Sequence, residues 1–554
     1  MGEVSTRHGL PPLVARLLLN RGLAASEDIL AFLDPALERL HPPFRLADLD
    51  KAAARLAQAV LHQEPLAVYG DYDADGLTAT AVLRLFFQEL GLTCVSYIPD
   101  RLTEGYGLKV PALKKLAAQV RLLVTVDCGI SDAAEVAWAT AHGLEVIITD
   151  HHELPPELPE ALALINPKRG GADYPFGELA GVGVALLLAL GVRAELRDAG
   201  WFGDKEEPNL RAYLDLVALG TAADVVPVVG ENRILVQNGL KVMEDSRRPG
   251  FMALKEIAGL EGKPISYRDL VFRLAPRLNA AGRLGQAQAA LELLLSQDLA
   301  QARVQAQYLN NLNRQRQSLE EEMLRQAEAL VRQQGLSRRP VMILALEGWH
   351  PGVLGIVAAR LAEAYHRPVA LINLEDGWGR GSARSIEGFH LFKGLHACRA
   401  HLSKYGGHQA AAGFVLPGEK VAALQAGLEE AFVEQVGEAH PQPSLKVDAQ
   451  VNLGDLNGTF FQHLDRLRPF GPGNPEPVFV CTGVQCLTSR VVGERHLKVQ
   501  LAQKDCLREA IAFDQAACHP LNGTLEIAFS TRLTHFKGRP TPELRLLDWG
   551  KMEE

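Results

Sequence analysis

Short apolar runs alternate with longer helical patterns over residues 46–235. The runs at 66–68, 122–126 and 144–148 are apolar almost throughout, as in strands that are buried on both faces of a sheet. The segment 77–90 instead repeats its apolar residues at helical spacing. This alternation of strand and helix predicts an α/β domain with a mainly parallel sheet covered on both faces.

The pattern changes along the rest of the chain. Residues 300–334 form a long pattern that is polar all round, which is typical of a helix bridging two domains. A strand pattern at 340–346 opens a second α/β domain, and short alternating segments after residue 445 predict a small antiparallel barrel. Helical patterns before residue 45 predict an N-terminal extension packed on the first domain. The predicted segments are 1–45, 46–235, 236–335 (helical connector), 336–440 and 445–554.

Acidic residues stand where three of the predicted strands end. Asp71, Asp73 and Asp75 follow the first run, Asp127 follows the second, and Asp150 with its two histidines follows the third. Carboxyl ends of parallel strands meet at one edge of a sheet, so these side chains are expected to converge. Hard carboxylate oxygens favour magnesium or manganese. Taken alone, the first stretch is equally typical of a solvated acidic turn before a helix.

Composition narrows the class of protein. The 554 residues are 47% hydrophobic, enough for several domains, and the seven cysteines include no CxxC pair. We see no leader and no apolar run of ~18 residues, so we expect a cytoplasmic protein without a membrane span. The net charge of −9 excludes a uniformly basic surface. Residues 267–316 nevertheless carry seven arginines against three acids, which leaves room for a nucleic-acid channel.

The acidic strand ends resemble a known superfamily. Gly-Asp-Tyr-Asp-Ala-Asp-Gly at 70–76, Val-Asp-Cys-Gly at 126–129 and Thr-Asp-His-His at 149–152 are similar to the first three motifs of the DHH phosphoesterases. Residues 218–227 resemble the fourth motif, for which we expect a strand that ends at Asp224. The resemblance implies that Asp224 is a metal ligand, with Asp215 as the competing candidate.

Later motifs extend the resemblance nearly to the end of the chain. Gly-Ser-Ala-Arg-Ser at 381–385 and Gly-Gly-His at 406–408 are similar to the associated DHHA1 domain, and we expect both in glycine-rich turns. Residues 348–356 resemble a stretch of the RecJ family, single-strand-specific 5′→3′ exonucleases with a C-terminal OB-fold. The mixture of cations and an aromatic at 532–539 then predicts a strand-binding loop.

The resemblance implies phosphodiester hydrolysis assisted by two ions, Mn²⁺ or Mg²⁺. Asp127 is the expected bridging ligand, and Asp71 is expected to orient a ligand or water. His152 follows His151 directly, so on an extended strand end it should point the other way and face the scissile phosphate as a donor or general acid. The expected metal ligands are Asp73, Asp75, Asp127, His151 and Asp224.

Single-stranded DNA is the substrate that the resemblance implies, in DNA repair and recombination. A RecQ-type helicase and a single-strand-binding protein are the expected partners of a monomer. An oligonucleotide or cyclic-dinucleotide phosphodiesterase of the DHH/DHHA1 type is the alternative, and a decayed binding protein or a pyrophosphatase are weaker ones. Glycines at 181 and 183 open a helix that suits either an anion or close packing. The expected substrate-binding residues are Arg101, Tyr106, Arg277, Asn279, Arg283, His350, Ser382, Arg384, Ser385, Gly406, Gly407 and His408.

Overall fold

The computed structural model describes residues 1–170, 173–437, 441–536 and 539–551. The chain divides into two compact units. The core unit comprises residues 43–224 and 242–444, and the barrel unit comprises residues 1–42, 225–241 and 445–554. Within the described residues, no helix combines the length and apolar composition needed to cross a bilayer.

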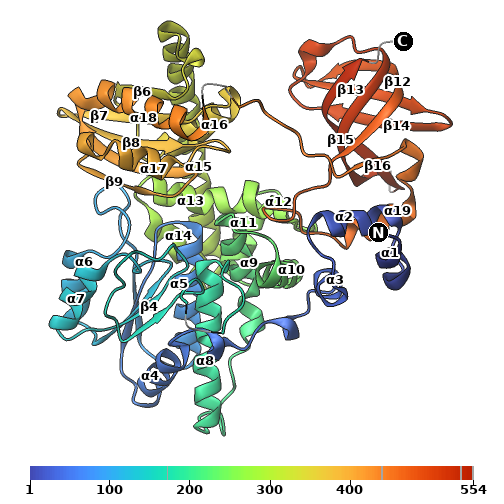
Figure 1. The fold of residues 1–554 in the computed structure, drawn as a ribbon. Coiled ribbons are helices and arrows are strands. Elements are labelled where there is room, and N and C mark those ends of the chain that lie inside the picture. The colour runs from blue at the N-terminus through green and yellow to red at the C-terminus, as the bar shows by residue number, and fades with distance from the viewer. Residues whose placement is uncertain (171–172, 438–440, 537–538, 552–554) are drawn as a thin grey trace. The chain divides into compact units, whose positions relative to one another are not determined.

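The first sheet of the core unit is parallel throughout, in the order β2-β1-β3-β4-β5. Helices α6 and α7 pack on one face of the sheet, and α4, α5 and α8 lie on the other (Figure 1). The predicted doubly covered α/β domain is therefore confirmed. The elements are α4 (Leu49–Leu61), β1 (Leu66–Tyr69), α5 (Ala74–Glu89), β2 (Cys94–Tyr97), α6 (Val110–Ala117), β3 (Leu122–Val126), α7 (Ala133–Ala141), β4 (Glu145–Thr149), β5 (Ala163–Ile165) and α8 (Gly181–Asp198).

A helical layer follows, and it corrects two predictions. The fourth motif lies on α9 (Leu214–Ala223) and not on a strand, because a short and fully buried apolar run looks alike in both structures. The proline and glycine that bound the segment 273–283 predict a turn, but this segment is mainly helix α13 (Ala275–Arg283), preceded by a π-helical turn. The long bridging helix is confirmed as α15. The remaining helices are α11 (Pro249–Ile257), α12 (Tyr267–Asp269), α14 (Ala287–Leu295) and α15 (Leu299–Gln334).

The second sheet has the order β6-β7-β8-β10-β9, in which the β6–β7 pairing is parallel and the others are antiparallel. The two predicted glycine-rich turns are wrong, since Ser382 and Arg384 lie on β8 and Gly406 and Gly407 lie on β9. The elements are β6 (Met342–Glu347), α16 (Leu354–Tyr365), β7 (Val369–Glu375), β8 (Trp378–Arg384), α17 (Leu391–Ala397), β9 (Lys404–Gly407), β10 (Ala411–Pro417) and α18 (Val421–Val436).

The barrel unit confirms the predicted C-terminal barrel, which is closed by a pairing of β12 with β15. Part of the expected binding loop at 532–539 is strand, and residues 537–538 lie outside the described residues. The β14–β16 pairing is parallel. The elements are β11 (Ala449–Gln450), α19 (Gly458–Asp465), β12 (Phe479–Val492), β13 (His496–Gln503), β14 (Cys506–Ala512), β15 (Gly523–Phe536) and β16 (Arg539–Lys551).

The N-terminal helices α1 (Gly2–His8), α2 (Pro12–Asn20) and α3 (Ser26–Leu33) belong to the barrel unit. Apolar residues of α2 and α3 share one hydrophobic core with the barrel strands, so the expected packing on the first domain is wrong. Arg233, on α10 (Gly230–Asp245), is 1% exposed and stabilises the packing of the N-terminal helices on the barrel. Its guanidinium donates to the carbonyls of Phe32, Arg466 and Leu467 at 3.0–3.1 Å.

Candidate metal centre

The first acidic motif joins β1 to α5 and is shaped by its own carboxylates. Asp73 is the N-cap of α5, where its Oδ1 accepts hydrogen bonds from the backbone N–H groups of Asp75 and Gly76 at 2.9 and 3.2 Å. Asp75 is 1% exposed and accepts from the backbone N–H groups of Gly181 and Val182, at 2.7 and 3.0 Å. The anion at the start of α8 is thus the protein's own Asp75.

Asp127 follows β3 in a left-handed backbone conformation, with φ of 60°. Its carboxylate packs so closely on the start of α8 that a Cβ at Gly181 would lie 2.7 Å from Asp127 Oδ1. A Cβ at Gly220, on α9, would similarly lie 2.9 Å from Asp75 Oδ1. Two glycines far apart in the sequence therefore make space for the two buried acids.

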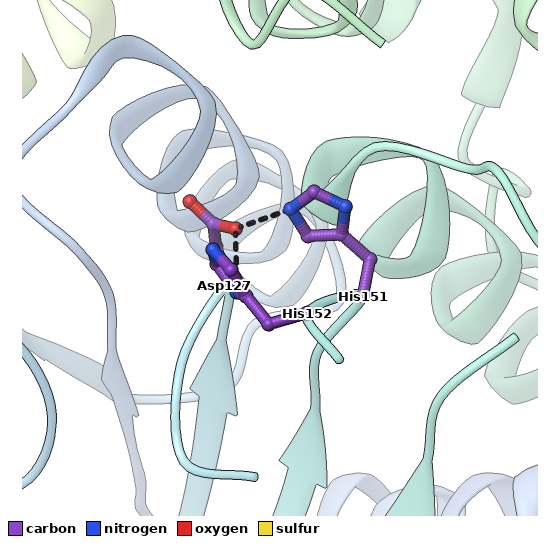
Figure 2. Close-up of side chains that lie close together, drawn as sticks. All are labelled: Asp127, His151 and His152. Atoms are coloured by element: carbon purple, nitrogen blue, oxygen red, sulfur yellow. Dashed lines mark ion pairs between the residues drawn. The ribbon is translucent and has the colours of Figure 1, made fainter. Parts of the chain in front are cut away.

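His151 and His152 both turn toward Asp127 (Figure 2). The distances from Asp127 Oδ1 are 3.0 Å to His151 Nε2 and 4.0 Å to His152 Nδ1. The prediction that the two imidazoles point in opposite directions is wrong. Strand β4 ends at Thr149, and beyond it the backbone no longer alternates.

Asp150, to which the sequence assigned no role, organises this turn. Its buried carboxylate accepts hydrogen bonds from the backbone N–H groups of Ile130, His151 and His152 and lies 2.7 Å from His152 Nδ1. An acid directly before paired histidines was the available signal. Carboxylate partners of this kind fix the orientation and charge of an imidazole.

Asp224 caps the C-terminus of α9 and lies 3.6 Å from His151 Nε2. Asp215, at the other end of this helix, is 1% exposed and pairs with Arg248 at 3.1 Å and with Ser246 at 2.8 Å. The structure therefore brings Asp224, and not Asp215, to the acidic cluster.

Three overlapping groups of side chains have ligand atoms within 4.8 Å of one another. Asp127 Oδ1, His151 Nε2 and Asp71 Oδ1 are buried and have no hydrogen-bond partner. Unsatisfied polar atoms are costly in a protein interior, and a divalent cation satisfies carboxylate and imidazole together. The donor set thus fits divalent metal ions. The groups are Asp71 with Asp73 and Asp127, Asp75 with His151 and Asp224, and Asp127 with His151 and His152.

Electrostatics of the metal-free cluster also suit cations. Burial, followed by the nearby Asp73, raises the pKa of Asp75 to about 7. Burial and the neighbouring acids raise the pKa of Asp127 well above its ordinary value. Burial lowers the pKa of His151 to about 3, which leaves a neutral imidazole, the form that binds metals. For His152, burial acts to lower the pKa, but the hydrogen bond with Asp150 outweighs it and raises the pKa to about 9.

In the described part of the chain Arg101, Arg283 and Arg384 form no ion pair with a carboxylate, and they lie beside the acidic cluster. Burial lowers the pKa of Arg283 to about 9, and repulsion from Arg101, Arg316 and Arg384 adds to the effect. A Cβ at Gly355, in the first turn of α16, would lie 2.6 Å from Arg384 Nη2 and 2.9 Å from Ser382 Oγ. Mutually repelling guanidiniums beside a helix N-terminus suit an anion. Predicted residues Arg101, Arg283, Ser382 and Arg384 are thus brought together.

Two other predicted substrate residues are near the cluster. The Tyr106 hydroxyl lies 3.1 Å from His152 Nδ1 and donates to the Asp127 carbonyl at 3.2 Å, while the residue is 41% exposed. Burial and His152 lower the pKa of His408, which follows β9. Gly407, with φ of 139°, leaves no space for a Cβ, which would lie 2.4 Å from the Ala411 carbonyl.

Gly406 pairs with Gly413 of β10 in the second sheet. The other four predicted residues contact other parts of the protein. Asn279 Oδ1 accepts from the Ala74 backbone N–H at 2.8 Å and so supports the first motif. Arg277 donates to Asn310 at 3.1 Å, and Ser385 donates to the Phe389 carbonyl at 2.7 Å. His350 Nδ1 accepts from the backbone of its own turn before α16. All four residues therefore have hydrogen bonds within the protein.

Three family models match the chain. Residues 65–221 match the DHH family N-terminal domain, 339–434 the DHHA1 domain and 447–548 the RecJ OB domain.

Known proteins match nearly all of this chain. The single-stranded-DNA-specific exonuclease RecJ of Bacillus subtilis strain 168 is 36% identical over 547 residues, which are 97% of this chain and 68% of that protein. The crystal structure of RecJ from Thermus thermophilus in complex with Mn²⁺ superposes with a TM-score of 0.85 at 34% identity, covering 100% of this chain and 78% of that one. The Mg²⁺ complex gives 0.79 at 32% identity, covering 100% and 76%. This chain belongs to the RecJ family of DHH phosphoesterases.

Proposed function

We propose that this protein is a metal-dependent exonuclease that hydrolyses single-stranded DNA in the 5′→3′ direction, in DNA repair and recombination. The observation that carries the proposal is the buried set of unsatisfied carboxylate and imidazole atoms around Asp127. Membership of the RecJ family supports the substrate, and the Mn²⁺ and Mg²⁺ complexes of the Thermus protein support the choice of metals.

The acidic cluster would hold two divalent ions, and Asp127 would serve as a ligand shared by the pair. Bound ions would polarise the phosphodiester and lower the pKa of the attacking water. Asp71 joins the ligand set in this proposal because its orphaned Oδ1 belongs to the same group as Asp73 and Asp127. The ligands are Asp71, Asp73, Asp75, Asp127, His151 and Asp224.

His152 is the proton donor of the proposed reaction. The Asp150 carboxylate favours its protonated form, because the hydrogen bond between them raises the pKa of His152. A cationic imidazole beside the cluster can hydrogen-bond the scissile phosphate or protonate the leaving oxygen. The Tyr106 hydroxyl lies 3.1 Å from His152 Nδ1 and so positions the imidazole ring.

The direction of digestion follows from an anchor for the 5′-terminal phosphate. Arg283, Arg384 and Ser382 at the start of α16 supply charge and hydrogen bonds but read no base. A strand anchored there presents its first internal phosphodiester to the acidic cluster. We further propose a cytoplasmic monomer that works with a RecQ-type helicase and a single-strand-binding protein, both inferred from the family resemblance alone.

Digestion of end-labelled single and double strands, with and without Mn²⁺, tests the proposal. The single strand should shorten from its 5′ end, and only with metal. Asp127→Ala should abolish cleavage while DNA binding survives, and the exposed Asp198→Ala serves as the matched control. Cleavage by Asp127→Ala in metal-saturated buffer would disprove the assignment. Hydrolysis of cyclic dinucleotides but not of long single strands would instead favour the small-nucleotide alternative.

A further inference from the structure

A cavity of about 450 Å³ lies in the core unit between the loop after β2 and the second sheet. Its size is typical of small-molecule sites, which span ~300–1,000 Å³. Residues 101–105 form one wall, and parts of β8, β9 and β10 form another. Figure 1 shows this loop rising from the first sheet toward β9, and Arg380 Nη1 donates to the Leu102 carbonyl at 3.4 Å.

Strand register gives the direction of this cavity relative to the acidic cluster. Arg384, Ser382 and Arg380 alternate along β8 and therefore share one face of the sheet. Across β10, Ser382 is in one row with Gly406, and Arg380 is in the next row with Lys404. Arg384 pairs with Ala411, whose carbonyl accepts from the His408 backbone at 2.8 Å. His408 lies within electrostatic range of His152 and Glu153, which follow β4, so this row is nearest the acidic cluster.

The row of Arg380 and Lys404 therefore lies beyond the proposed 5′-phosphate anchor. Successive rows are about 7 Å apart, two residues along a strand. Digestion begins at the 5′-terminal nucleotide, so no further nucleotide precedes the anchored phosphate. When the DNA carries a 5′-monophosphate, none of its phosphates reaches Arg380 and Lys404.

Positive charge dominates the cavity. Arg101, Arg380 and Lys404 line it, and none of them forms an ion pair with a carboxylate in the described part of the chain. The one acid that lines it, Glu104, already accepts hydrogen bonds from the Tyr97 hydroxyl and the Asp100 backbone, both at 2.7 Å. Three cations around one cavity favour a multiply charged anion.

We propose that this cavity receives the outer phosphates of a 5′-polyphosphate whose first phosphate is held by Ser382 and Arg384. The inference rests on the proposed 5′ anchor. It assigns to the protein a second class of ligand, which is either a 5′-triphosphorylated nucleic-acid end or a free nucleoside triphosphate. Both carry the same polyphosphate chemistry, and the test separates them.

The first arm compares oligonucleotides that differ only in a 5′-monophosphate or a 5′-triphosphate, at constant free Mn²⁺. Wild type should digest both. Arg380→Gln and Lys404→Gln should each lower kcat/KM for the triphosphate about tenfold more than for the monophosphate. Lys420→Gln, on an exposed residue outside the cavity, should leave the ratio unchanged. Lys404→Gln also leaves the Arg380–Leu102 contact intact, which separates charge loss from loop movement.

The second arm uses ATP and AMP as competitors of the monophosphorylated strand, again at constant free Mn²⁺. Stronger inhibition by ATP, lost in Lys404→Gln, identifies free nucleotides as ligands; digestion of the triphosphate identifies nucleic-acid ends. If neither digestion nor inhibition depends on the outer phosphates, the cavity proposal is wrong. A wild type that digests no single strand at all refutes the exonuclease instead, and ATP binding measured by calorimetry then still tests the cavity.

Discussion

Without bound metal, the protein should lose stability as the pH rises, because the acidic cluster then holds protons in place of cations. Burial and Asp73 raise the pKa of Asp75 from 3.8 to about 7, so between these values folded Asp75 binds a proton that unfolded Asp75 releases. Stability is then lost with rising pH. At 1.36 kcal/mol per pH unit the whole shift corresponds to about 4 kcal/mol, of which about 3 kcal/mol is lost between pH 5 and 8.

His151 opposes this trend over part of the range. Its pKa is lowered to about 3 in the folded protein, so below its ordinary value near 6.5 its stability contribution rises with pH. A comparison of wild type with Asp75→Asn cancels the histidine, because both proteins contain it. Urea unfolding of EDTA-treated protein, followed by tryptophan fluorescence at several pH values, measures the difference.

The wild type should lose about 3 kcal/mol relative to Asp75→Asn between pH 5 and 8 without metal. Saturating Mn²⁺ should reverse the dependence, because the cation replaces the protons and binds only the folded state. Parallel stability curves for the two metal-free proteins would refute the electrostatic description of the cluster. So would a Mn²⁺ effect of equal size in wild type and in Asp75→Asn.

Three further outcomes are expected. Gly181→Ala should weaken Mn²⁺ binding at least tenfold in calorimetry, because the new Cβ would lie 2.7 Å from Asp127 Oδ1. The control Gly454→Ala, whose Cβ meets nothing within 4 Å, should bind Mn²⁺ like the wild type, and equal affinities of the two variants would contradict the prediction. Asp150→Asn should move the alkaline limb of the kcat/KM–pH profile toward the ordinary histidine value, from about 9, and an unmoved limb would exclude His152 as the acid. Arg233→Met should lower the free energy of unfolding of the barrel unit by about 3 kcal/mol in urea, because three carbonyls lose their donor. The control Arg16→Met, at an exposed position, should leave it unchanged. An unchanged stability of Arg233→Met would show that the carbonyls find other donors.

Sequence patterns located the acidic cluster because its strands are short, apolar and followed directly by acids. The same patterns failed at the fourth motif, where a buried apolar run was taken for a strand and proved to be α9. The outcome for Asp224 was unaffected, since the end of either element can reach the cluster. Alternation failed at His152 because it applies only inside a strand, and β4 ends at Thr149.

The sequence patterns did not predict which distant segments contact each other. An amphipathic pattern at α2 shows that one face is buried but not that the barrel covers it. Likewise, the glycines at the start of α8 indicated an anion or close packing, and Asp75 supplies both. Removal of residues 445–554 alone would therefore uncover the apolar faces of α2 and α3, so it does not test the role of the barrel in substrate choice.

The arrangement of charge in the core unit gives the strongest argument for a phosphate substrate. Asp75 and Asp127 repel each other, and Arg283 is repelled by three other arginines, although Asp73 already attracts it. A protein selected for stability alone would pair these opposite charges, since each group loses solvation on burial. Their separation is explained if the ligands supply the missing charges: cations neutralise the acids, phosphates neutralise the arginines, and a nucleic-acid strand held by both has its terminal phosphate at one cluster and its first phosphodiester at the other.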